Sequence, residues 1–218
     1  MVRNLHPKQQ RSPVRGFFLV LEGIEGSGKT TLAQGLAGKL ESLGYGVILT
    51  REPGGTPVGE KIRDILLHSG GDISPWAEFF LFLASRREHT SKVIKPALVE
   101  GKVVISDRYY LSSFAYQGYG RGLPLRILPR LNRLATGGLV PDLTIIADLP
   151  VEEAFARLGK ERDRFEAEAE EFHERVRQGY LRIARRAGKR IRVIDTTRPR
   201  EEVLEEAWGM VAERLQGK

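Results

Sequence analysis

Short apolar runs alternate with amphipathic segments along most of this chain. Five such runs are only four or five residues long and are bounded by polar or glycine-containing segments: residues 17–21, 47–50, 103–106, 143–147 and 191–194. Short continuous apolar runs are typical of strands that are buried on both faces, as in parallel sheets. The pattern therefore predicts five buried strands.

Helical periodicity fills the intervals between these runs. After the first run, four leucines recur every three or four residues: Leu32, Leu36, Leu40 and Leu43. This spacing predicts a helix over residues 30–43 that stops near Gly44. Further helices are expected at residues 60–67, 111–117, 125–135, 151–158, 166–187 and 200–215.

One more predicted helix is apolar nearly all round. It begins at Ser74-Pro75, a favourable helix start, and continues through residues 76–83, which include four aromatic residues. A helix that is apolar on every side is expected to lie centrally.

The alternation of strands and helices predicts an α/β fold, a five-stranded parallel sheet with helices on both faces. Ligands of such folds bind at the carboxyl ends of the strands. We expect one domain over residues 16–218, preceded by a disordered basic tail over residues 1–15.

Composition narrows the protein class. The 218 residues are 41% hydrophobic and 29% charged, as in ordinary globular proteins, and there is no cysteine for disulfides or thiolate chemistry. No apolar run approaches the ~20 residues that span a bilayer. The first fifteen residues lack the apolar segment of a signal peptide. We expect a cytoplasmic protein with no membrane contact.

Charge is concentrated at one end of the chain. The net charge is +7, and four of the basic residues, with no acid among them, lie in the first fifteen residues: Arg3, Lys8, Arg11 and Arg15. The remaining surplus of three is modest. Nucleic acid is therefore an unlikely partner, and weak contact through the tail is the minor alternative.

A phosphate-binding pattern follows the first predicted strand. It matches G-x-x-x-x-G-K-[ST] in full and sits between a strand and a helix start. Its glycines let backbone N–H groups surround an anion. We assign triphosphate binding to Gly23, Ile24, Glu25, Gly26, Ser27, Gly28, Lys29, Thr30 and Thr31. Lys29 would reach the β- and γ-phosphates, and Thr30 would bind Mg²⁺.

Arginines at the ends of the predicted strands indicate a second phosphate. Arg51 follows the second strand, Arg108 follows the third, and Arg86 lies on the aromatic helix. Each alone could be a surface ion pair, but together they suit a phosphate monoester. The chain has no Asn-Lys-x-Asp guanine-reading motif and is too short for a motor domain, which favours a kinase.

These segments resemble thymidylate kinases. The resemblance rests on residues 22–30, on Arg-Glu-Pro-Gly-Gly-Thr at 51–56 and on Asp-Arg-Tyr at 107–109. It continues through residues 81–86, 112–118, 163–166 and 194–196. The resemblance implies transfer of the γ-phosphoryl group of ATP to dTMP with Mg²⁺, and a homodimer. The alternatives are a kinase for another monophosphate or small metabolite and, less favoured, a nucleic-acid-associated ATPase.

The resemblance also implies residue roles. Arg51 and Arg108 would hold the monophosphate of dTMP, Arg86 would read a base carbonyl, and Phe82 would stack on thymine unless it packs in the core. The remaining roles concern the sugar, the base edge, the metal and adenine. Glu25 and Tyr116 would lie at the sugar, Ser113 and Gln117 at the base, Asp107 at the metal unless it forms a salt bridge, and Asp195 and Thr196 at adenine.

The predicted lid covers residues 157–166. Thymidylate kinases carry a catalytic arginine either in the phosphate loop or in the lid, and Gly26 occupies the loop position here. An arginine of this kind contributes roughly 10³–10⁵ in rate. The candidates are Arg157, Lys160, Arg162 and Arg164, with Arg162 favoured and Arg157 next; Arg164 could instead pair with Glu166 or lie at the adenine-side loop.

Overall fold

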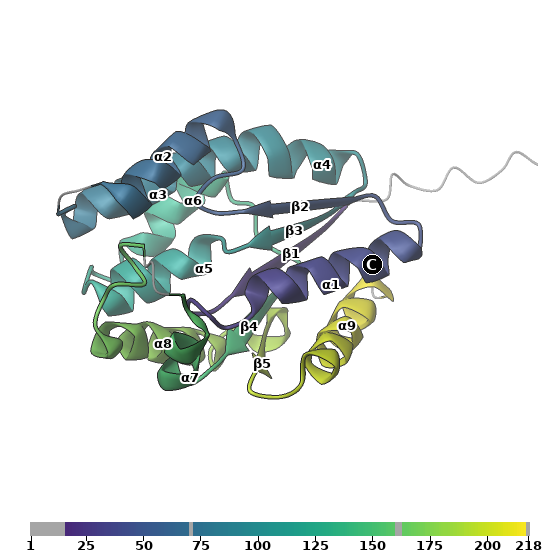
Figure 1. Cartoon of the computed structure of the whole chain (residues 1–218). Helices are drawn as coiled ribbons and strands as arrows, with labels where there is room; N and C mark the ends of the chain where they lie inside the picture. The colour runs from purple at the N-terminus through teal and green to yellow at the C-terminus, as the bar shows by residue number, and fades with distance from the viewer. Residues whose placement is uncertain (1–15, 70–71, 160–162, 217–218) are drawn as a thin grey trace, which may run out of the picture.

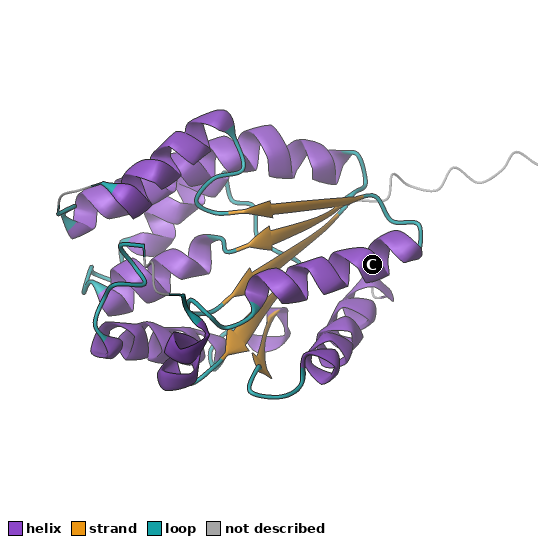
Figure 2. Cartoon of the chain, viewed as in Figure 1, coloured by secondary structure: helices purple, strands orange, loops and turns teal. Residues whose placement is uncertain are grey.

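The fold is a parallel sheet covered by helices on both faces (Figures 1 and 2). The computed structural model describes residues 16–69, 72–159 and 163–216. The predicted basic tail, residues 1–15, lies outside the described residues.

All five predicted strands are confirmed. They are β1 (Phe17–Glu22), β2 (Val47–Arg51), β3 (Val103–Asp107), β4 (Leu143–Asp148) and β5 (Ile191–Asp195). They pair in parallel in the order β2-β3-β1-β4-β5. Each strand extends one residue beyond its predicted apolar run, and that residue is charged in every case. The carboxyl edge of the sheet is therefore lined with charge.

Both faces of the central strand are buried, which explains its continuous apolar sequence. Phe17, Leu19 and Leu21 pack against α1 (Lys29–Ser42) and α9 (Arg200–Gln216). Phe18 and Val20 point to the other face, where they meet η1 (Thr90–Ile94) and α4 (Lys95–Val99). Successive residues of a strand point to opposite faces, so both sets must be apolar.

The other helices follow the predicted order, except that η1, α4 and η3 (Gly188–Arg190) were not predicted. They are α2 (Pro57–His68), α3 (Pro75–His89), α5 (Tyr110–Ser113), η2 (Phe114–Gly120), α6 (Leu128–Thr136), α7 (Val151–Arg157), α8 (Glu170–Ala184) and η3. The helix predicted over residues 166–187 begins only at Glu170. The preceding segment instead forms a turn in which Asp163 Oδ1 accepts from the backbone N–H groups of Phe165 and Glu166, at 2.8 and 2.9 Å.

The expectation that the aromatic helix is central was wrong in part. In α3, Phe79 and Phe82 are buried, but Trp76 and Phe80 are 37% and 54% exposed. Their rings lie 5.9 Å apart on the outward side of the helix. The inward side of α3 packs between α2 and α6. Only two of the four aromatic residues of this helix are therefore buried within the chain.

No helix in the described ranges has the length and the apolar content that a transmembrane span needs.

Candidate active site

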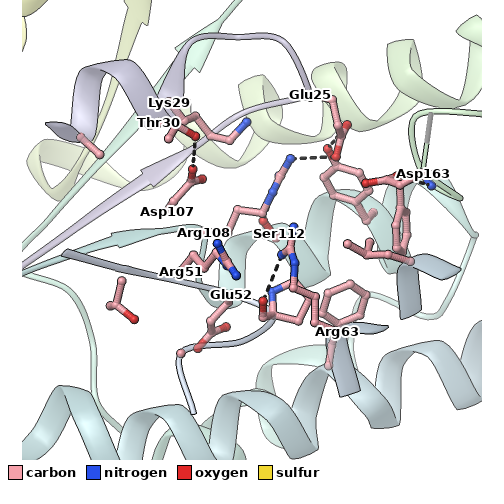
Figure 3. A pocket seen from close by; sticks show the side chains of 18 of the residues that line it. Glu25, Lys29, Thr30, Arg51, Glu52, Arg63, Asp107, Arg108, Ser112 and Asp163 are labelled. Carbon is pink, nitrogen blue, oxygen red and sulfur yellow. Dashed lines mark hydrogen bonds and ion pairs between the residues drawn. The ribbon is translucent and has the colours of Figure 1, made fainter. Parts of the chain in front are cut away.

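A cavity of about 750 Å³ opens at the carboxyl ends of β1, β2 and β3. Its lining includes cationic side chains from four elements or their ends, namely Lys29, Arg51, Arg63 and Arg108. It also includes an aromatic wall, which we define as Phe82, Tyr116 and Phe165. Figure 3 shows Arg51, Arg63 and Arg108 near one another within this cavity. One cavity thus offers both charge for phosphates and flat rings for a base.

The phosphate loop, residues 23–30, joins β1 to α1 as predicted. Gly28 caps α1 with a φ of 85°, a left-handed conformation that suits glycine. Gly26 also has a positive φ, 72°, and a Cβ there would lie 2.5 Å from the backbone oxygen of Ala154 in α7. The glycine at position 26 therefore allows α7 to approach the loop.

Lys29 is folded back onto its own loop. Its Nζ donates to the backbone oxygen of Ile24 at 2.7 Å and to Ser27 Oγ at 3.4 Å. Burial, assisted by the nearby positive charge of Arg108, lowers the pKa of Lys29 to about 8. The present partners of the Lys29 amine are a carbonyl and a hydroxyl oxygen, which carry no full charge. Phosphate oxygens would supply the negative charge.

Thr30 and Asp107, both expected at the metal, lie within hydrogen-bonding distance of each other. Thr30 Oγ1 donates to Asp107 Oδ2 at 2.8 Å at the edge of the cavity. Among the described residues no group of three or more His, Cys, Asp or Glu side chains could hold a metal. A hydroxyl and one carboxylate are nevertheless a donor set that fits Mg²⁺, because this ion keeps several waters and takes further oxygens from substrate phosphates.

Arg108, which follows β3, is hydrogen-bonded to the phosphate loop that follows β1. Its Nη1 donates to the backbone oxygen of Gly23 and its Nη2 to Glu25 Oε1, both at 2.8 Å. Its backbone has a φ of 71°, the one left-handed non-glycine residue in the described chain. Such a conformation costs of order 1 kcal/mol or more and occurs often at functional sites.

Glu25 receives a second hydrogen bond on its other oxygen. The hydroxyl of Tyr116 donates to Oε2 at 2.6 Å. Burial opposes ionisation of Glu25, but the charges of Arg108 and Lys29 and the Tyr116 bond prevail, and the pKa of this carboxyl is lowered. Glu25, which lines the cavity, is thus held as an anion.

Glu22 is a site residue that sequence reasoning missed. This fully buried carboxylate accepts from the backbone N–H groups of Tyr109 and Ser112, at 3.0 and 3.2 Å. It also accepts from the hydroxyls of Ser112 and Tyr180, at 2.6 and 2.8 Å. Burial raises its pKa despite these bonds. Glu22 fixes the turn that carries Arg108. The sequence feature that could have identified Glu22 is its charge at the end of an apolar run.

Arg51 and Arg63 occupy the β2 side of the cavity. Arg51 is exposed and its Nη2 lies 3.0 Å from Glu60 Oε2. Arg63, which the sequence analysis did not select, projects from α2 and donates from Nη1 to the Pro53 oxygen at 3.1 Å. Burial and the charges of Arg51 and Arg108 lower the pKa of Arg63. The only feature of the sequence that pointed to Arg63 as a site residue was its position one helical turn after Glu60.

Arg86 and Ser113, which the resemblance places at the base, are not among the residues that line the cavity. Arg86 is fully buried and donates to Glu52 Oε2, Ser113 Oγ and Asn132 Oδ1, at 2.7, 2.8 and 2.6 Å. A fourth bond goes from its Nη2 to the Tyr109 oxygen. A buried guanidinium needs such partners, and here they come from the protein.

Gln117, by contrast, lines the cavity next to the aromatic wall. Phe165 lies 5.8 Å from Phe82 and 5.9 Å from Tyr116 between ring centroids, so the wall is continuous. The sequence pattern did not predict Phe165 as a site residue, because nothing in its sequence context distinguishes a cavity wall from a core position.

The candidate lid residues differ in whether the structure describes them and in what they contact. The favoured catalytic residue, Arg162, and Lys160 lie outside the described residues. Arg164 does not pair with Glu166, as one expectation held; its Nη2 lies 2.7 Å from Glu78 Oε2 on α3, and its Nε donates to the Leu66 oxygen at 2.7 Å. Arg164 is therefore held against α2 and α3.

Arg157 lies with the residues expected at adenine. Its Nη2 donates to the Thr196 backbone oxygen at 3.1 Å, and Thr196 Oγ1 in turn donates to the Asp148 oxygen at 2.9 Å. Asp195, Thr196 and Arg157 are not part of the central cavity lining. The structure thus gathers them at the β5 end of the sheet, beyond β4 from the phosphate loop.

Known proteins resemble this chain over nearly its whole length. The family model "Thymidylate kinase" matches residues 21–207. Relatives of that name include one from Pelotomaculum thermopropionicum, 53% identical over 189 residues (85% of this chain and 88% of that protein). Another, from Nitratidesulfovibrio vulgaris strain DP4, is 51% identical over 208 residues (91% and 93%). The crystal structure of thymidylate kinase from Ehrlichia chaffeensis superposes with a TM-score of 0.76 at 36% identity, covering 90% of this chain and 98% of that one.

The close approach of α7 to the phosphate loop yields a stability prediction. Gly26→Ala is expected to lower the free energy of unfolding by about 1–3 kcal/mol and to raise the KM for the triphosphate, because the new Cβ meets backbone at a positive φ. Gly38→Ala on α1, where a Cβ meets nothing within 4 Å, is the matched control and should be neutral or slightly stabilising. Urea unfolding and triphosphate kinetics measure both effects. A Gly26→Ala protein as stable as the parent would show that α7 adjusts.

Proposed function

The chain belongs to the thymidylate kinase family, and we propose that its central cavity binds the two nucleotides of that reaction with the residues described above. The enzyme transfers the γ-phosphoryl group of ATP to dTMP, giving ADP and dTDP. The observation that carries the residue assignment is the single cavity that joins a phosphate loop, several guanidinium groups and an aromatic wall.

The phosphate loop is proposed to hold the triphosphate of ATP. The backbone N–H groups at the start of α1 and the Lys29 amine face the same region, and both favour phosphate oxygens. Binding would release Lys29 from the Ile24 carbonyl. Thr30 and Asp107 would hold Mg²⁺, which would neutralise part of the phosphate charge.

Arg108 and Arg51 are proposed to hold the phosphate of dTMP, with Arg63 as a third cation. Arg108 touches Gly23 of the phosphate loop, so a phosphate bound to Arg108 lies next to the phosphates bound by that loop. A phosphate oxygen of dTMP can then attack the γ-phosphorus while the bond to the β-phosphate oxygen breaks. No covalent intermediate is required, because positioning and charge stabilisation account for catalysis of this kind.

The sugar and the base are proposed to lie toward the aromatic wall. Glu25 would accept a hydrogen bond from the 3′-hydroxyl, and Tyr116 would occupy the space of a 2′-hydroxyl. Phe82 would stack on thymine and Gln117 would contact its edge. A direct contact of Arg86 or Ser113 with the base would require a change in their present hydrogen bonds.

Adenine is proposed to lie at Asp195 and Thr196, near Arg157. Because Arg164 is held by Glu78 and Arg157 by Thr196, we propose Arg162 as the lid arginine that stabilises the transferring phosphoryl group.

A homodimer is proposed from the outward faces of three adjacent helices. Trp76 and Phe80 of α3, Val58 and Ile65 of α2, and Leu134 of α6 are exposed, each at more than a third of its surface. Exposed apolar patches of this kind mark interaction surfaces, and a second copy of the chain offers the same patch in return.

Acceptor choice tests the proposed function. An assay that couples ADP release to oxidation of NADH is expected to show turnover with dTMP, weaker turnover with dUMP by roughly 10–200-fold, since one methyl group separates them, and little with UMP, CMP, AMP or GMP. Lys29→Ala should abolish turnover with every acceptor. Equal rates with several other monophosphates would refute the acceptor assignment.

Arg108 provides a test of the phosphate sites. Arg108→Ala is expected to weaken dTMP binding by about 100-fold, because a charge-assisted guanidinium–phosphate pair is lost, with a smaller effect on ATP. Arg126→Ala, at an exposed position away from the cavity, is the control. Calorimetric titration with each nucleotide separates the two effects. A larger loss for ATP than for dTMP would place the acceptor elsewhere.

The dimer has its own test. Phe80→Glu is expected to convert a dimer to monomers at micromolar concentration, because a charge would be buried without a partner. Leu43→Glu, at a 61% exposed position at the end of α1, is the control and should stay dimeric. Sedimentation velocity distinguishes the species, and a monomeric parent protein would contradict the proposal.

A further inference from the structure

A buried carboxylate connects the base end of the cavity with Arg164, near the end of the predicted lid. Glu78, in the first turn of α3, has no exposed surface. Its Oε1 accepts from Nε2 of Gln117 at 2.9 Å. Its Oε2 forms ion pairs with Nη2 of Arg164 at 2.7 Å and with Nη2 of Arg121 at 3.3 Å.

The two arginines explain how this carboxylate is tolerated in the interior. An unpaired buried charge costs several kcal/mol, and two guanidinium groups compensate it here. Arg121 is itself paired with Glu168 at 2.6 Å, so the cluster contains two cations and two anions. Arg164 precedes Phe165, so the same cluster anchors one side of the aromatic wall.

The carboxylate also determines which way the Gln117 amide faces. A carboxylate offers acceptors only, so the NH₂ group of Gln117 must turn toward Glu78. Gln117 is 1% exposed and lines the cavity. With its nitrogen engaged by Glu78, the amide oxygen is the acceptor that remains for a bound base.

An amide oxygen discriminates between pyrimidines by the proton on N3. Thymine and uracil carry one ring N–H once the sugar is attached, at N3, and it can donate to this oxygen. Cytosine in the same pose has an unprotonated N3, whose lone pair would face the oxygen. Sites built around one hydrogen bond reject ligands that cannot form it far more strongly than they reject a missing methyl group.

We propose that Glu78 is a positioning residue that determines base specificity: it fixes the Gln117 amide so that the site accepts a ring N–H and rejects cytosine. The inference rests on the proposed placement of the base beside Gln117. Under this proposal Glu78 contributes to the rejection of cytosine, which is separate from recognition of the thymine methyl group.

The test compares Glu78→Gln with Glu168→Gln. A glutamine at position 78 can offer either amide atom, so Gln117 is free to turn and to donate to cytosine N3. The ratio of kcat/KM for dTMP to that for dCMP is expected to fall about 5- to 10-fold, which corresponds to one neutral hydrogen bond. The dTMP to dUMP ratio should change less than about 3-fold, because the methyl contact does not involve the amide. Glu168→Gln removes a neighbouring charge on Arg121 but does not touch Gln117, and both ratios should stay at the parent values.

A folding defect would not leave the inference untested. Glu78→Asp keeps the negative charge between the two arginines but withdraws it from Gln117, and it should give the same selective fall. An active Glu78→Gln or Glu78→Asp enzyme that keeps the parent dTMP to dCMP ratio overturns the proposal, as does an equal change in both ratios. Failure of the proposed function is distinct, since the parent enzyme would then not phosphorylate dTMP.

Discussion

The Arg108 guanidinium links the end of β3 to the phosphate loop, and the surrounding residues hold it in place. It sits at the end of β3 in a left-handed conformation and contacts both Gly23 and Glu25 of the phosphate loop, which follows β1. Because β1 and β3 are neighbours, loops from distant parts of the sequence meet at this point. Glu22 then holds the segment after Arg108 through three hydrogen bonds, from Tyr109 N, Ser112 N and Ser112 Oγ, and accepts a fourth from Tyr180 of α8.

Buried ionic groups recur around this point, and each has a partner of opposite charge or a set of donors. Glu52 accepts from Arg86 and lies 3.0 Å from Nδ1 of His89, while Glu78 lies between Arg121 and Arg164. Charges without such partners would cost several kcal/mol each. These buried charges are better explained by a role in orienting side chains than by a contribution to the stability of the fold. Apolar residues of similar volume would fill the same space at no electrostatic cost.

Much of the site was predictable because its signals are local. The phosphate loop, the Thr30–Asp107 pair and the gathering of Arg51 and Arg108 each follow from a motif at the end of an apolar run. Arg63, Phe165 and Glu78 were not selected for the site, because each lies in an ordinary helical or turn sequence. Arg86 was expected at the base, yet its hydrogen bonds go to Glu52, Ser113 and Asn132, which come from three other segments.

The sequence by itself determined the five strands, most of the helices and the position of the glycine-rich loop between β1 and α1. These depend on interactions between residues close in the chain, or on burial patterns that repeat every two or four residues. Only the tertiary structure decided which polar groups pair. Glu78 and Gln117 lie 39 residues apart, and Arg164 and Leu66 lie 98 apart. Packing selects such partners among many chemically equivalent candidates, because a buried donor or acceptor must be satisfied by whichever group the fold places within reach.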